Sequence, residues 1–201
     1  MARPRQFEEA EVLERAMSQF WKAGFGATSV SDLEQATGLP RVSLYNAFGD
    51  KSALFRASLE RYQQMAFDFF ENDAFKDGGL SSIETLFRNL AKRRPKDAPE
   101  HYGCLMLNTV LDSDSVAPDA LMIVDVCRTQ MVEGFAKALR TASEQGAAIA
   151  TERTIKDRAE FLVSAMWGAR MTARLRRDVT AGRGTTRTVL AAIDGWRSVT
   201  N

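Results

Sequence analysis

The chain has 201 residues, of which 45% are hydrophobic and 26% are charged, so it can bury a core and is not expected to be disordered. Its formal net charge of +1 gives no sign of a nucleic-acid partner. The sequence has no apolar run long enough for a membrane span and no apolar segment typical of a secretory signal, so we expect a cytoplasmic protein. Two cysteines, Cys104 and Cys127, fit a reducing compartment and are too few for a disulfide framework.

Helical periodicity runs through nearly the whole chain, and no segment alternates as a half-buried strand would. In the first predicted helix, 8–23, Val12, Ala16 and Phe20 form an apolar stripe, and Gly24 can end the helix. Further helices are predicted at 29–37, 40–48, 51–70, 80–94, 102–111, 118–144, 154–179 and 185–199. We therefore predict an all-α protein of about nine helices, with one domain at 1–62 and a second at 63–201.

The segment 29–48 has the layout of a helix-turn-helix motif. Ser29-Val30-Ser31-Asp32 fits a capping box, and Gly38 lies in the turn between two short helices. In this motif the second helix enters the major groove of DNA. Helix 40–48 is too short to be stable alone, so one of its faces must pack against the domain core. Because such spacing also occurs in all-α proteins that bind no DNA, the layout by itself leaves both alternatives open.

The outer face of helix 40–48 carries residue types that recognise base edges and phosphates. Arginine can bind guanine through two hydrogen bonds, serine and asparagine both donate and accept, valine can touch a thymine methyl, and a tyrosine hydroxyl can donate to phosphate. Near this helix, the start of helix 29–37 can bind a phosphate through its free N–H groups. A lysine at the start of helix 51–70 is unfavourable for the helix dipole, which makes sense if it meets a phosphate. An irregular N-terminal arm with two arginines can enter a minor groove. The predicted DNA-binding residues are Arg3, Arg5, Thr28, Ser29, Arg41, Val42, Ser43, Tyr45, Asn46 and Lys51.

Three stretches, FWKAGFGATSVSDL at 20–33, ATGL at 36–39 and SLYNAFGDKSALF at 43–55, closely resemble the DNA-binding domain of the TetR/AcrR family. The resemblance covers about residues 7–62. It implies that Tyr45 and Lys51 contact phosphates and that Thr28 opens the second helix, whereas Ala47 is smaller than the residue the family usually has there. It also implies a homodimeric transcriptional regulator, most often a repressor that a small molecule releases from a palindromic operator.

The last two predicted helices combine small and apolar residues at helical spacing. Small residues let two helices approach closely, and with the family resemblance this predicts a four-helix dimer interface. Its predicted residues are Phe161, Ser164, Ala165, Gly168, Ala169, Val189, Ala192, Ile193 and Trp196. The alternative is that these residues pack within a single chain.

A small-molecule pocket is expected among the helices of the second half, with a largely apolar wall and a few polar groups. The candidate lining residues are Tyr62, Met65, Phe69, Phe87, Met106, Asn108, Thr109, Cys127, Met131, Phe135, Trp167 and Met171. For each of them the alternative is a plain core position. Asn108 and Thr109 stand out because polar side chains in an apolar segment need partners.

An enzyme on an all-α scaffold is the competing class of protein. The sequence has one histidine, His101, in a predicted polar loop, and it has no phosphate loop, no nucleophile–histidine–acid set and no metal-ligand spacing. We therefore expect no enzymatic activity, no cofactor and no metal site. A further alternative is a DNA-binding regulator without a ligand, switched by oxidation of Cys104 or Cys127.

Overall fold

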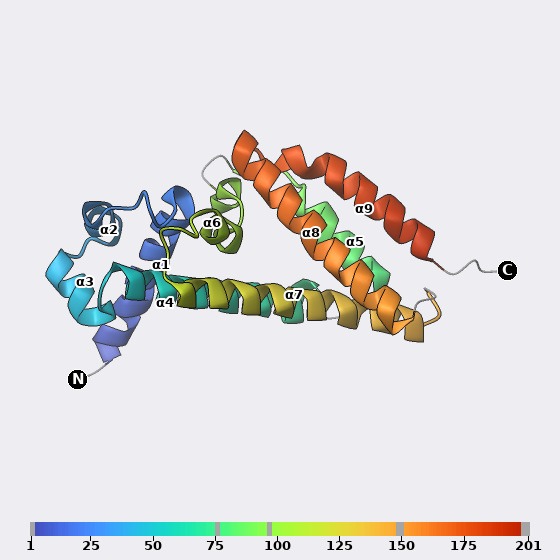
Figure 1. Ribbon diagram of the computed structural model, residues 1–201, viewed down its shortest axis with the longest axis horizontal. Coiled ribbons are helices and arrows are strands. Elements are labelled where there is room, and N and C mark those ends of the chain that lie inside the picture. The colour runs from blue at the N-terminus through green and yellow to red at the C-terminus, as the bar shows by residue number, and fades with distance from the viewer. Residues whose placement is uncertain (1–2, 75–76, 96–97, 148–150, 198–201) are drawn as a thin grey trace. The chain divides into compact units, whose positions relative to one another are not determined.

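The computed structural model describes residues 3–74, 77–95, 98–147 and 151–197 (Figure 1). In these ranges the chain forms nine α-helices and no strand. The all-α prediction is therefore confirmed. The helices are α1 (Arg3–Ala23), α2 (Val30–Thr37), α3 (Arg41–Phe48), α4 (Lys51–Asp68), α5 (Gly79–Leu90), α6 (Leu105–Leu111), α7 (Pro118–Glu144), α8 (Glu152–Arg176) and α9 (Arg183–Trp196). A π-helix, η1 (Phe69–Ala74), and two 3-10 helices, η2 (Pro99–Tyr102) and η3 (Val179–Gly182), complete the described elements.

Helix α1 begins earlier than predicted, at Arg3 instead of Glu8. Pro4 does not interrupt it, because a proline in the first helical turn lacks only an N–H group that would have no helical partner anyway. Arg3 and Arg5 therefore belong to a helix, and the prediction that they lie on an irregular arm is wrong.

The segment predicted as one helix at 102–111 is divided into η2 and α6. Gly103 lies between them with a φ of 85°, a left-handed conformation that glycine adopts without steric cost. A Cβ atom at this position would also lie 3.2 Å from the carbonyl oxygen of Arg170, so the close approach of α8 favours glycine here. Helix α7 has the predicted bounds.

The chain divides into two compact units. The first consists of Met1–Gln64 and Cys104–Val126, and the second consists of Met65–Gly103 and Cys127–Asn201. The first unit thus includes α6 and the start of α7, both of which belong to the predicted second domain at 63–201. Two side chains join this segment to the N-terminal helices: Asn108 Nδ2 donates to the Trp21 carbonyl oxygen at 3.3 Å, and Asp112 Oδ2 accepts from the Phe25 N–H at 2.8 Å.

The core of the first unit is built around aromatic and leucine side chains. Phe20, Leu33 and Leu44 bring α1, α2 and α3 together, and all three are fully buried. The rings of Phe20 and Phe55 meet edge to face, with centroids 4.9 Å apart. Burying a leucine side chain of this kind contributes about 1.5–3 kcal/mol, which explains how the short α3 is held in place.

The core of the second unit centres on Phe135 of α7. Its ring lies 5.8 Å from that of Phe70 and 6.2 Å from that of Phe87, centroid to centroid, and both Phe87 and Phe135 are fully buried. Helices α8 and α9 run side by side in opposite directions, and α5 packs against α9 (Figure 1). Leu162 of α8 and Ile193 of α9 are buried in this layer.

Candidate nucleic-acid interface

Helix α2 starts at the capping box that the sequence predicts. The Ser29 hydroxyl accepts from the Asp32 N–H at 3.1 Å, and the Asp32 carboxylate accepts from the Ser29 N–H at 2.8 Å. The Ser29 hydroxyl also donates to Asp32 Oδ2 at 2.6 Å. These hydrogen bonds stabilise the charged carboxylate and lower the pKa of Asp32 below its usual value. The start of α2 is therefore fixed by local side-chain chemistry.

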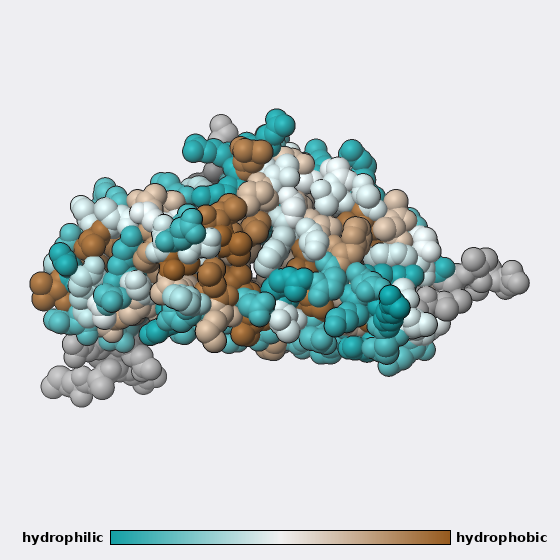
Figure 2. All heavy atoms as spheres, in the orientation of Figure 1, coloured by the Kyte–Doolittle hydropathy of each residue, from teal (hydrophilic) through white to brown (hydrophobic). Residues whose placement is uncertain are grey.

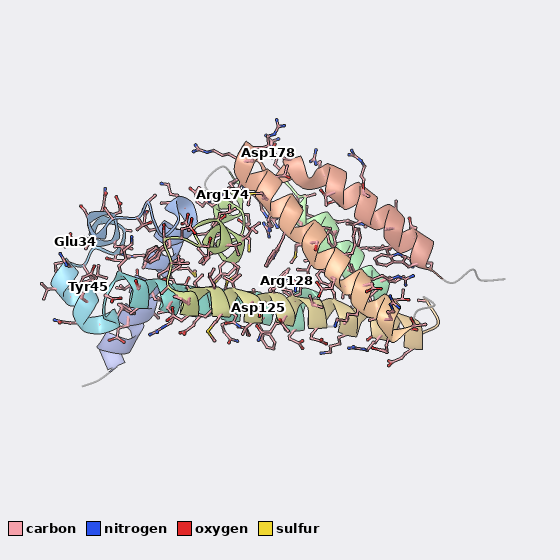
Figure 3. All side chains as sticks on the ribbon, in the orientation of Figure 1. Glu34, Tyr45, Asp125, Arg128, Arg174 and Asp178 are labelled. Carbon is pink, nitrogen blue, oxygen red and sulfur yellow. The ribbon has the colours of Figure 1, made fainter. Side chains whose placement is uncertain are left out.

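Helix α3 is capped by a residue of α2. Pro40, which precedes α3, provides no side-chain cap, and instead Glu34 Oε1 accepts from the Arg41 N–H at 2.6 Å. The turn between the two helices passes through Gly38, whose φ of 74° is readily available to glycine. Glu34 on α2 and Tyr45 on α3 lie on adjacent helices of the first unit (Figure 3). The angle between the two short helices is thus set by a turn, a cap and the buried Leu44.

The outer face of α3 is exposed as predicted from its amphipathic pattern. Arg41, Ser43 and Asn46 are exposed, and the apolar Val42 has 70% of its surface accessible. Tyr45 is half-buried, and the guanidinium of Arg41 lies 5.2 Å from the centre of its ring. The surface over α2 and α3 is mostly hydrophilic with small hydrophobic spots (Figure 2). This face presents the mixture of groups that base edges require.

Two predicted phosphate donors are occupied within the protein. Thr28 is 1% exposed, and its hydroxyl donates to the Gly24 carbonyl oxygen at 2.6 Å. The Ser29 hydroxyl is engaged with Asp32 in the capping box. Neither hydroxyl is presented as a donor in this structure, because Thr28 bonds to the residue that follows α1 and Ser29 caps the start of α2. The prediction that these two hydroxyls donate to phosphate is therefore not supported by their hydrogen bonds.

Lys51, the first residue of α4, rests against the turn between α1 and α2. Its ammonium nitrogen lies 4.2 Å from the centre of the Phe25 ring, a cation–π arrangement. Partial burial lowers the pKa of Lys51, and the nearby Asp112 carboxylate opposes that shift. Asp112 also accepts from the Phe25 N–H at 2.8 Å. Asp112 could not be predicted from the sequence, because no local pattern connects residue 112 with residues 25 and 51.

The predicted ligand-pocket residues lie in both units. Met106, Asn108 and Thr109 are buried in the first unit, where Asn108 donates to the Trp21 carbonyl oxygen and Thr109 to the Leu105 carbonyl oxygen. Tyr62, also in the first unit, donates its hydroxyl to Cys104 Sγ at 3.6 Å. In the second unit Phe87, Cys127, Met131 and Phe135 are buried, Trp167 and Met171 are half-buried, and Met65 and Phe69 are exposed. The polar groups at 108 and 109 thus hydrogen-bond to the protein's own backbone.

The predicted dimer residues fall into two groups. Phe161, Ser164 and Gly168 form an exposed row on α8, and Ala165, Ala192 and Trp196 are half-buried. Ala169, Val189 and Ile193 are buried within the single chain. A methyl group at Gly182 would lie 3.1 Å from Ala169 Cβ, so Ala169 packs closely against η3. The alternative stated for these three residues, packing within one chain, therefore describes them better.

The capped pair α2–α3, its glycine turn and the exposed polar face of α3 define a helix-turn-helix protein. Residues 12–58 match the family described as bacterial regulatory proteins, tetR family. Over 118 residues the chain is 37% identical to the HTH-type transcriptional repressor ComR of Escherichia coli (strain K12), a match that covers 56% of this chain and 55% of ComR. The match thus spans about half of that relative's length. The chain is thus similar to TetR-family transcription regulators, through the family match at residues 12–58 and through this relative.

Solved structures of the family share the fold over nearly the whole chain. A TetR-family regulator from Cytophaga hutchinsonii superposes with a TM-score of 0.80 at 14% identity, covering 100% of both chains. CifR, a TetR-family regulator solved as a cysteine mutant with double-strand operator DNA, has a TM-score of 0.69 at 23% identity and covers 93% of this chain and 95% of its own. At these identities the likeness concerns the fold. None of the helices in the described ranges combines the length and apolar character that a bilayer crossing requires.

Proposed function

We propose that the protein is a homodimeric DNA-binding repressor that leaves a palindromic operator when it binds a small molecule. The observation that carries the proposal is the exposed face of α3. The opposite face of this helix packs into the core through Leu44, and Glu34 caps its first turn. The relative ComR is a repressor, and the structural neighbour CifR is complexed with operator DNA, which supports the same role for this chain.

Contacts with DNA divide into two kinds in this proposal. Arg41, Val42, Ser43 and Asn46 read base edges, since they are exposed on the helix that enters the major groove. Tyr45 and Lys51 contact phosphates and set the position of α3 on the duplex. Phosphate contacts contribute to binding on every sequence, whereas base contacts distinguish one sequence from another.

Dimerisation is proposed through the exposed row of α8. One protomer carries one recognition helix, and a palindrome of two half-sites needs two of them about one DNA turn apart. Phe161, Ser164 and Gly168 are exposed on one face, and Gly168 has no neighbouring atom within 4 Å of where a Cβ would stand. Leu175, which is 78% exposed, extends the same helix face with an apolar side chain. A second copy would cover this row, as a four-helix bundle does.

The proposed effector is mostly apolar and carries a hydrogen-bond acceptor. Trp167 on α8 has its indole N–H shielded from solvent, and no acceptor for it is present among the described residues. Met171, one turn further along α8, is also half-buried. A buried donor without a partner is costly, so an acceptor brought by a ligand would be stabilising. The thiol-switched alternative has less support, because Cys104 and Cys127 are both buried and burial makes thiols inert.

The test is selection of duplexes from a random-sequence library with the wild-type protein, repeated with Arg41→Ala. We expect the wild type to enrich a palindrome and Arg41→Ala to lose preference at particular base pairs, by roughly 1–3 kcal/mol each. Arg93→Ala, a change at an exposed arginine after α5, removes the same charge and serves as the control. Failure of the wild type to enrich any sequence would refute the proposal, and a uniform loss by Arg41→Ala would move Arg41 to the phosphate contacts.

A further inference from the structure

The end of α6 holds the turn between α1 and α2 from outside. Asn108 donates to the last turn of α1 at the Trp21 carbonyl oxygen, and Asp112 accepts from the Phe25 N–H in the turn itself. The turn fits closely beneath this segment: a methyl group at Gly24 would lie 2.5 Å from Asp112 Oδ2, and one at Gly26 would lie 3.3 Å from Ser115 Oγ. The turn is therefore shaped by residues almost ninety positions later in the chain.

Phe25 connects this contact to the proposed phosphate contact. Its backbone N–H is held by Asp112 at 2.8 Å, and its ring lies 4.2 Å from the ammonium of Lys51. The same ring packs against Phe55 at 4.8 Å between centroids, so its place is defined on both sides. The location of the Lys51 side chain thus depends on where the Phe25 ring stands, and that depends on Asp112.

We propose that Asp112 is a positioning residue for DNA binding: by accepting from Phe25, its carboxylate fixes the ring against which Lys51 is held for a phosphate. This inference rests on the DNA binding proposed above. Asp112 needs no contact with DNA for this role. Without the acceptor, the Phe25 N–H loses its partner and the turn gains freedom, so Lys51 must be ordered at the moment of binding, at a cost in side-chain entropy.

Electrostatics alone predicts the opposite result for removal of Asp112. A carboxylate near Lys51 repels phosphates, so deleting it should strengthen binding to any duplex. A positioning role predicts weaker binding even though the protein becomes more positive. The sign of the change therefore separates the two roles. Asp114→Ala is the matched control, because Asp114 is exposed in the same loop and its removal changes the net charge equally.

The experiment measures affinity by fluorescence anisotropy for a duplex selected with the wild-type protein and for an unselected duplex of the same length. We expect Asp112→Ala to bind both about three- to tenfold more weakly than wild type, as the loss of one partnered N–H and its ordering implies. Asp114→Ala should bind as tightly as wild type or more tightly. Thermal melts of each variant serve as the control that it is folded at the assay temperature.

Two further variants keep the inference falsifiable if Asp112→Ala folds poorly. Asp112→Asn retains an oxygen that can accept from Phe25 and should bind at least as tightly as wild type. In a double-mutant cycle, Asp112→Ala and Lys51→Ala should be non-additive, because both remove the same phosphate contact. The inference would be overturned by additive losses in this cycle or by stronger binding of Asp112→Ala. It would also be overturned if Asp112→Ala and Asp112→Asn weakened binding equally. Wild-type protein that binds neither duplex would instead refute the proposed function.

Discussion

Lys51 offers the sharpest test of the proposed DNA binding. Its ammonium is half-buried against Phe25 at the start of α4, where the helix dipole disfavours a cation. Partial burial also lowers the pKa of Lys51, so this position is costly for the charge in the free protein. A lysine at such a place is explained if it meets a phosphate in the complex.

The expected effect of Lys51→Ala follows from counterion release. Each phosphate contact contributes about −0.9 to the slope of log affinity against log salt, so the proposed dimer, which loses two contacts, should have a slope shallower by about 1.8. Between about 50 and about 200 mM salt, wild-type affinity should then fall about twelvefold more than that of the variant. The loss should be similar for selected and unselected duplexes, because phosphate contacts carry no sequence information.

Anisotropy titrations over this salt range measure the slope directly. Lys92→Ala is the control, because Lys92 is exposed in the second unit and its removal changes the net charge equally. If the slope of Lys51→Ala equals that of wild type, Lys51 does not contact a phosphate. If Lys92→Ala changes the slope by the same amount, the effect is one of total charge and the reasoning fails.

Three further predictions concern the dimer, the core and the start of α2. Gly168→Leu should leave the chain folded, because the site has room within one chain, but should convert the proposed dimer to a monomer in light scattering, because the large side chain keeps the two α8 helices apart; a variant that stays dimeric would exclude this interface position. Phe135→Ala should lower the free energy of unfolding by about 3–5 kcal/mol, since it removes a fully buried ring between Phe70 and Phe87; a much smaller loss in denaturant titrations would show that the core collapses around the gap. Asp32→Asn should lower the melting temperature at neutral pH but not in strong acid. The folded pKa of Asp32 is lowered by its hydrogen bonds to Ser29, so its stabilisation is present above the ordinary carboxyl pKa and is lost as pH falls through the folded value. A melting difference that persists unchanged into strong acid would contradict this assignment.

Local sequence was sufficient for features that depend on neighbours in the chain. The capping box at Ser29, the glycine turn at Gly38 and the amphipathic pattern of α3 each involve residues a few positions apart, and the structure has all three. The exposure of Arg41 and Asn46 followed from the buried position of Leu44 on the same short helix. Such features can be predicted from the sequence because helix periodicity and capping act over one or two turns.

Tertiary structure decided the features that join distant residues. Nothing near Trp21 or Phe25 in the sequence shows that Asn108 donates to the Trp21 carbonyl oxygen or that Asp112 accepts from the Phe25 N–H. Ala169 was predicted in the dimer interface, and only its burial against Gly182 shows that it belongs to the core of a single chain. Asp112 is the clearest case, because its hydrogen bond with Phe25 and its electrostatic effect on Lys51 exist only once α6 packs beside the end of α1. Hydrogen bonds and burial depend on distance in space, so a single sequence without its fold could not reveal them.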